Sequence, residues 1–366
     1  TKDNKMKTIM KYMLVALTTL SFSVANAGDL SITGDAKASY VITSSDASAG
    51  SQEKGKGLGV SNEFSLSASG ELDNGWSWNY AQDIDGSTVQ DDAKLTVTTG
   101  LGTVGVFISE GGIESVNAAS QSVIARPSDT SLDENMLDNF NLSGVNTLQY
   151  HTPADLLPFG ITAKVAYAPS MAANANASYK AGGAANIGSF TAATNSGASA
   201  DPFAQTAAMG QSATHYRVDA APIDGLKIGA DYLDYDGVVG ATEQSPESGA
   251  YYLTYAFGPA TVGYSRGYVA TALGNGTDVL ESVDARKMSI AANVNDQFSI
   301  SYEDEKSDPS LQTGATTTFP VESTGIQAAY TMGGMTLAVA MNNHENVDYT
   351  ENKDVSETVF SVAMAF

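Results

Sequence analysis

The stretch that decides the fold is Leu30–Tyr40, LSITGDAKASY, in which two kinds of residue alternate. Its even-numbered positions are apolar or small, while the odd-numbered positions carry Ser31, Thr33, Asp35 and Lys37. Successive side chains of a β-strand point to opposite faces, so a period of two predicts a strand with one apolar and one polar face. Because the polar face carries charges, we expect it to meet water.

The same alternation recurs along the chain. It is found at residues 63–68, 94–98, 104–108, 161–167, 215–220, 226–232, 251–257, 287–294, 298–302, 326–330, 337–341 and 358–366. The breaks between runs alternate between tight turns, such as Asp73–Gly75 and Gly258–Pro259, and long polar segments. The long segments are 43–60, 110–143, 169–212, 236–248, 271–283, 305–323 and 343–356. Short and long connections in alternation predict an up-and-down meander of antiparallel strands.

Two architectures can use such strands. A soluble sandwich would need large side chains on its buried face and two protected edges, whereas the second face here carries Lys, Asp, Arg, Thr and Ser. In lipid a sheet must be closed, because no backbone group can stay unpaired. The apolar runs of about 8–11 residues match a tilted transmembrane strand. The sequence therefore predicts an all-β, antiparallel, transmembrane β-barrel of about 16 strands, an even number that leaves an aqueous lumen.

The first 27 residues are typical of a secretory signal peptide. Lys7 and Lys11 precede an uncharged stretch, Tyr12–Val24, and a small-x-small cleavage site at Ala25–Ala27. The stretch is too short for a membrane helix, which needs about 20 residues. We therefore expect two parts: the cleaved segment 1–27, and a barrel domain of residues 28–366.

Composition limits the function. The chain has a net charge of −23, and removal of 1–27 leaves 339 residues with −26. So acidic a chain is not suited to binding nucleic acid, but its field favours cations. Cysteine is absent, and His151, His215 and His344 lie in no metal-ligand spacing. The sequence predicts no enzyme, metal or other cofactor, apart from weak divalent-cation binding by acid-rich loops such as 303–305.

Three segments resemble the Gram-negative trimeric porins. They are Asp29–Gly34, the strand Gly102–Phe107 followed by a long loop, and the terminal strand Thr358–Phe366. The resemblance implies a homotrimer in the outer membrane whose third loop folds into the lumen as a constriction. It also implies that Phe360, Val362, Met364 and Phe366 present a signature to the barrel-assembly machinery. The family's acidic motif at the loop tip has no clear counterpart here.

The candidate pore residues fall in two groups. The constriction loop offers Glu110, Glu114, Arg126, Asp129, Asp133, Glu134 and Asp138. A basic wall on the water-facing parity offers Lys37, Lys94, Lys164, Arg217, Lys227 and Lys287. If the loop folds inward, acids would face bases across the narrow point and orient polar solutes. If it lies outside, its acids are merely solvated.

The predicted function is passive diffusion of small hydrophilic solutes and ions across the outer membrane, with a preference for cations. A non-conducting barrel acting as an adhesin or surface-structural protein would explain the long acidic loops equally well. The sequence leaves open whether a channel would be general or substrate-specific. Expected partners are the solutes, membrane lipid, lipopolysaccharide, the assembly machinery and two further copies of the chain.

Overall fold

The structure is a computed structural model of the chain. It describes residues 30–45, 55–85, 88–108, 112–130, 136–142, 145–169, 212–236, 243–273, 280–311 and 319–365. The predicted signal segment 1–27 and the terminal Phe366 lie outside the described residues.

Strands make up most of the described chain. They are β1 (Leu30–Ser45), β2 (Gly55–Glu71), β3 (Ser77–Asp85), β4 (Thr88–Thr99), β5 (Gly102–Ile108), β6 (Thr147–His151), β7 (Thr162–Ala168), β8 (Ser212–Ile223), β9 (Leu226–Asp236), β10 (Glu247–Phe257), β11 (Ala260–Ala270), β12 (Leu280–Asn293), β13 (Phe298–Leu311), β14 (Val321–Met332), β15 (Met335–Glu345) and β16 (Val355–Ala365). The helical turns are η1 (Val116–Ala119), η2 (Pro127–Asp129), η3 (Pro158–Gly160) and η4 (Val347–Tyr349). No helix in the described part is long and apolar enough to cross a bilayer.

The strands form one closed antiparallel sheet. Each pairs with its neighbours in sequence, and β16 pairs with β1, with Tyr40 opposite Phe360. Closure gives every strand two partners, so no edge is left with unpaired backbone groups. The predicted all-β, antiparallel barrel is confirmed, with 16 strands.

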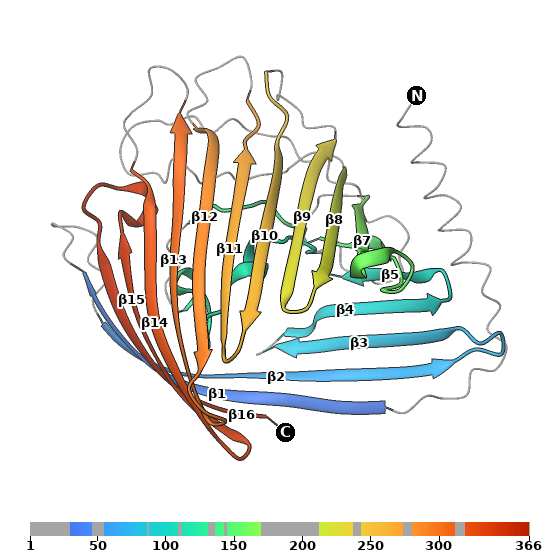
Figure 1. The fold of residues 1–366 in the computed structure, drawn as a ribbon, viewed down its shortest axis with the longest axis horizontal. Coiled ribbons are helices and arrows are strands. Elements are labelled where there is room, and N and C mark those ends of the chain that lie inside the picture. The colour runs from blue at the N-terminus through green and yellow to red at the C-terminus, as the bar shows by residue number, and fades with distance from the viewer. Residues whose placement is uncertain are drawn as a thin grey trace.

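Tight turns close the hairpins at one rim, and Figure 1 shows those of β8–β15 at the lower ends of the strands. Gly75 between β2 and β3 and Gly225 between β8 and β9 have φ of 78° and 76°, a region that costs glycine little. Several predicted loop boundaries are wrong, because the strands extend further. The loop expected from residue 305 begins later, because β13 continues to Leu311 with Glu305 paired to Lys287 of β12. The loops expected to end at residues 60 and 283 end earlier, because β2 begins at Gly55 and β12 at Leu280.

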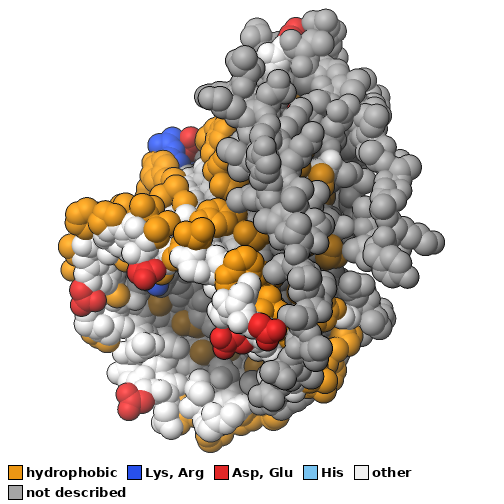
Figure 2. All heavy atoms as spheres, turned by 90° about the vertical axis from the view of Figure 1, so that its right-hand side faces the viewer, with side chains coloured by type: hydrophobic (Ala, Val, Ile, Leu, Met, Phe, Trp, Pro, Cys, Tyr) orange, Lys and Arg blue, Asp and Glu red, His pale blue; other side chains and the backbone are white. Residues whose placement is uncertain are grey.

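The barrel wall has two chemically different faces. On β12, Met288 and Ile290 point outward and are 50% and 43% exposed, whereas Lys287 and Ser289 point inward and are buried. The outward faces of the other strands carry exposed Tyr, Leu, Ile and Met side chains in the same way. Figure 2 shows hydrophobic side chains around the described wall and a hollow between them. An apolar outer band around a polar interior is the arrangement of a membrane barrel.

The segment between β5 and β6, residues 109–146, is called the inner loop. Its η1 contacts β10, β11 and β12, and its η2 contacts β13, β14 and β15. In Figure 1 this segment, in teal, lies behind β10–β13, inside the barrel. Its apolar residues join inward side chains of the wall in the main hydrophobic cluster, for example Leu142 with Leu233 and Val269. The predicted inward-folded third loop is confirmed.

Candidate functional site

Two glycines of β11 leave space on the inner wall where the inner loop crosses it. A Cβ built on Gly263 would lie 1.8 Å from the carbonyl oxygen of Ala119, and one on Gly267 would lie 2.8 Å from that of Asp138. Both distances are far below van der Waals contact. Any side chain at these two positions would therefore have to push the loop into the lumen.

Inward serines bind the backbone of the loop. Ser265 of β11 donates to the carbonyl of Val116 at 2.7 Å, and Ser289 of β12 donates to that of Ala119 at 2.6 Å. The remaining contacts of this kind involve Ser248, Ser301 and Ser307. Backbone N–H and C=O groups of the loop that are shielded from water need hydrogen-bond partners. These serine hydroxyls supply them.

Two longer polar side chains, on β13 and β14, form further hydrogen bonds with the loop. Glu303 accepts hydrogen bonds from Ser120 at 2.5 Å and Ser122 at 2.7 Å. Gln327 accepts from the backbone of Ile124 at 2.9 Å and donates to the carbonyl of Ala125 at 2.6 Å. The loop is thus attached along its described length from β10 to β14.

A largely buried group of charges fixes the middle of the loop; we call Arg126, Asp138, Lys287 and Glu305 the latch cluster, and the exposed Asp129 lies at its border. Lys287 of β12 contacts the Asp138 carboxylate directly. Arg126 reaches Asp138 and Asp129 at 2.7 Å each. The Glu305 carboxylate lies 3.5 Å from Arg126 and 3.6 Å from Lys287, so each cation has carboxylates on two sides.

The charged state of this cluster follows from its neighbours. Burial by itself would raise the pKa of Asp138, but the positive charges of Lys287 and Arg126 outweigh it and hold the pKa below its usual value. Burial likewise opposes the charge on Arg126, while Asp138, Glu305 and Asp129 together raise its pKa. Asp138 and Arg126 are therefore both ionised at neutral pH, and the charge of each is stabilised by the opposite charges around it.

A second attachment lies near the start of the loop. Asp231 of β9 accepts the backbone N–H of Ser115 at 2.7 Å, contacts the hydroxyl of Ser115, and lies 3.0 Å from His215 Nε2. All three side chains are buried. The serine donates to the carboxylate and not to the imidazole, so this trio lacks the order of a nucleophilic triad. It serves as an anchor.

A row of basic side chains lines the wall beside this anchor. His151 of β6 is the register partner of Lys164 of β7, which is the partner of Arg217 of β8. Arg217 binds Asp219 with distances of 2.8–3.0 Å and donates to the carbonyl of Glu114 at 2.7 Å. In the described part of the chain, Lys164 forms no ion pair and is only half-buried.

No family model matches the chain, and no curated protein matches it. Solved structures do. The anion-selective porin from Comamonas acidovorans has a TM-score of 0.64 at 12% identity, covering 93% of this chain and 100% of that chain. OmpT with loop L8 deleted, an outer membrane protein of Vibrio cholerae, has 0.61 at 13%, with coverage of 93% and 100%. A mutant of the Rh. blastica porin has 0.53 at 12%, with coverage of 92% and 100%.

The chain has the bacterial porin fold. In this chain the inner loop is the third connection on the rim opposite the tight turns, after those between β1 and β2 and between β3 and β4, and it is the segment that enters the barrel. At this level of identity the likeness establishes the architecture. The chemistry of the lumen has to be read from this chain's own residues.

The residues proposed for the basic wall occupy three kinds of position: the inner wall, the rim, and the interface beneath the inner loop. Lys37 of β1, Lys94 of β4, Lys164 and Arg217 lie on the inward parity and are half-buried. Lys227 of β9 is next to a tight turn and exposed, so it stands at the rim. Lys287 was expected on the open wall; it is instead 1% exposed beneath the inner loop.

The residues proposed for the constriction loop also occupy different positions. Glu110, Asp133 and Glu134 lie outside the described residues. Arg126 and Asp138 belong to the latch cluster and face the wall, and Asp129 is exposed. Glu114 is half-buried near Arg217. On β16, Phe360 and Met364 point outward, Val362 shares their parity, and Phe366 is not described.

Sequence reasoning missed the wall residues that hold the loop. Glu303, Asp304 and Glu305 were expected in an external acidic loop, but all three lie in β13, and Glu303 and Glu305 are buried inward. The available signal was parity: Ser299, Ser301, Glu303, Glu305 and Ser307 continue the polar face of the run that begins at Phe298. The described residues contain no group of three or more His, Cys, Asp or Glu side chains that could hold a metal ion.

Proposed function

We propose that the chain is an outer-membrane porin that lets small hydrophilic solutes and ions diffuse passively through a water-filled lumen. The observation that carries this proposal is the position of the inner loop. Its described part lies against the wall of β9–β15 and is fixed there, and the barrel beside it is hollow. Figure 2 shows the hollow.

Conductance in planar bilayers tests the proposal directly. Discrete steps with a linear current–voltage relation at low voltage are expected. Their absence from folded, inserted protein would favour the rival function, a non-conducting adhesin or surface-structural barrel. Swelling rates of reconstituted liposomes across a size series of sugars then separate a general channel, with a smooth decline, from a substrate-specific one.

For selectivity we propose a preference for cations, based on the net charge of −26 that remains after removal of residues 1–27. The row of Lys164 and Arg217 opposes it locally, so the balance is set by the whole lumen. One similar structure is described as anion-selective, which is a property of that protein. A reversal potential in a KCl gradient decides the sign, and a clear anion preference would exclude the proposed one.

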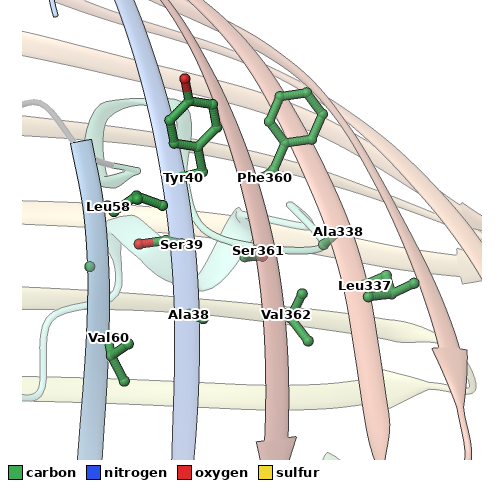
Figure 3. A pocket seen from close by; sticks show the side chains of 11 residues that line it. Ala38, Ser39, Tyr40, Leu58, Val60, Leu337, Ala338, Phe360, Ser361 and Val362 are labelled. Atoms are coloured by element: carbon green, nitrogen blue, oxygen red, sulfur yellow. The ribbon is translucent and has the colours of Figure 1, made fainter. Parts of the chain in front are cut away.

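We also propose a homotrimer that joins through the outer face around β1 and β16. There an apolar groove of about 650 Å³ opens above small residues, among them Ala38, between the walls formed by Tyr40, Phe360, Leu58 and Val60. Figure 3 shows these side chains on β1, β2 and β16. Ala38→Trp would fill the groove. It should reduce the trimer fraction in cross-linking, whereas Ala328→Trp on the outer face of β14 should not.

Export and assembly complete the proposed function. The signal segment 1–27 would direct secretion, and the terminal strand with Phe360, Val362 and Met364 would be recognised by the barrel-assembly machinery. Weak divalent-cation binding by external loops also stays a prediction. Loss of outer-membrane insertion on deletion of the last residues, with export unaffected, would support the role of the terminal strand.

A further inference from the structure

Three methionines lie side by side at the rim of the tight turns. Met332 ends β14, Met335 begins β15, and the two are register partners across the turn of Gly333 and Gly334. Met335 is also the partner of Met364, near the end of β16. Figure 1 shows the β14–β15 turn and the end of β16 together at the lower rim. Since register partners share a face of the sheet, the three side chains form one row, which we call the methionine row.

The methionine row lies on the outer face, at the aqueous end of the wall. Met332 and Met364 are 49% and 51% exposed, and Met335 is half-buried between them. Tyr330, the next outward residue of β14, donates its hydroxyl to the side chain of Gln297 at 3.1 Å, in the turn between β12 and β13. Tyrosine marks the boundary between membrane and water. The row is one outward position beyond Tyr330 and therefore lies on the water side of this boundary.

Open space adjoins the methionine row. A Cβ built on Gly333 or on Gly334 would meet no atom of the described chain within 4 Å, apart from its neighbours in sequence. Leu337 and Val362, the next outward residues of β15 and β16, line the groove that we propose for the trimer. The short turns of outer-membrane barrels face the periplasm. An ion in the periplasm therefore reaches the row from the turn side, next to the groove.

Thioether sulfur gives the row a chemistry that contact with lipid does not require. Leucine is equally apolar, but only methionine offers a soft sulfur ligand of the kind that selects Cu(I). Adjacent strands lie about 4.8 Å apart, so the α-carbons of Met332 and Met364 are roughly 10 Å apart, with Met335 midway. A methionine side chain is unbranched and turns about three bonds. The outer two can therefore lean inward until all three sulfurs face one ion.

We propose that Met332, Met335 and Met364 bind one soft monovalent cation, Cu(I) or its heavier relative Ag(I), on the periplasmic side of the barrel. The ion keeps its oxidation state, because binding only replaces its solvent or carrier ligands by thioethers. It joins β14, β15 and β16 at the rim and so stabilises the folded barrel by mass action. This inference rests on the proposed membrane location but not on conduction, so the two can fail separately.

The test replaces one thioether at a time. Met332→Leu, Met335→Leu and Met364→Leu each keep an apolar side chain of similar volume, a change that costs little stability. The matched control is Met341→Leu, on the same face of β15 and 59% exposed, where neither register partner carries sulfur. Folding and assembly of each variant are checked by heat-modifiable mobility and by cross-linking, and channel function by conductance.

The measurement is a titration of the whole, assembled protein in detergent with Ag(I), and with Cu(I) in the absence of oxygen, followed by native mass spectrometry. The wild type and Met341→Leu should bind one ion per chain that the triple Leu variant does not bind. Each single variant of the row should bind at least about tenfold more weakly, an effect that even groups supporting a metal ligand have on affinity. Saturation with Ag(I) should raise the temperature at which the folded form is lost in the wild type and the control only.

Equal affinity of Met335→Leu and Met341→Leu for Ag(I) would overturn the proposal. So would a triple variant that binds as many ions as the wild type, or substitutions that weaken Zn(II) binding as much as Ag(I) binding, since Zn(II) takes thiolate, imidazole and carboxylate ligands. If the triple variant does not fold, the single variants decide. A protein that binds Ag(I) through the row but fails to conduct would refute the channel and leave the site in place.

Discussion

The carboxylate of Asp138 in the inner loop lies in direct contact with the ammonium of Lys287 in β12, 149 residues further along the chain. Arg126 and Glu305 join them, so four charges are gathered in a place that water hardly reaches. Buried ion pairs add little net stability compared with apolar packing, but they strongly penalise any arrangement that separates the partners. The latch cluster therefore specifies where the inner loop lies, and with it the shape of the lumen.

Removal of Lys287 should release the loop. Lys287→Met leaves Asp138 and Glu305 buried with one cation fewer, a loss of about 3–5 kcal/mol when a buried pair is broken. We expect flickering single-channel currents and altered conductance. Lys37→Met, on the inward face of β1 away from the loop, is the control. Equally steady currents in both variants would show that the latch cluster does not position the loop.

Acid should release the loop only below the ordinary range of carboxyl groups. The pKa of Asp138 is depressed, so its contribution is fully present above the unfolded value of about 3.9 and is lost as pH falls through the lower folded value. Current noise should stay constant from neutral pH to about 4 and rise below it. Asp138→Asn should be noisy already at neutral pH. A transition in the wild type near pH 6 would point to another group.

Crowding the wall should move the loop without changing any charge. Gly263→Ala would place a methyl group 1.8 Å from the Ala119 carbonyl, so the backbone of the loop must shift toward the lumen. Gly59→Ala adds the same methyl group on the inward face of β2, where the nearest atom, Ser39 Oγ, is 3.5 Å away. We expect a lower conductance for Gly263→Ala only. Identical conductance of the two variants would contradict the observed contact.

The half-buried Lys164 should influence ion selectivity more than other lysines. It faces the lumen without an ion pair among the described residues, so Lys164→Glu should raise the cation-to-anion permeability ratio by about two- to fivefold, as expected for a change of two unit charges acting through water. Lys56→Glu, which changes the same charge outside the barrel, should leave the reversal potential in a KCl gradient unchanged. A similar shift in both would mean that net charge, and not the wall, governs selectivity.

Much of the barrel could be predicted because strand alternation is a local property. The parity of Lys287 and Met288 follows from sequence alone, and closure follows from the need to pair every backbone group in lipid. Short or weakly alternating strands are harder to predict, as for β6, which has only five residues, and for β11. Three acids in succession at Glu303–Glu305 suggest a polar break, although the alternation runs through them.

The latch cluster shows where such reasoning stops. The alternation along the strand predicts that Lys287 points into the barrel, and Asp138 is one of the acids in the long loop. If that loop folds inward, the sequence predicts that the two side chains face each other across the lumen. The structure brings them into contact, because Gly263 and Gly267 let the loop backbone lie flat on the wall. Neither the height of a strand residue nor the path of a loop is encoded in the period of two.

By itself, the sequence determined that this chain forms a closed barrel with a polar interior and an apolar exterior, since those features depend on neighbours along one strand and on the solvent each face meets. Only the tertiary structure decided which charged side chains face the lumen and which form the ion pairs that hold the loop. That division depends on contacts between residues more than a hundred positions apart, which exist only in the folded barrel.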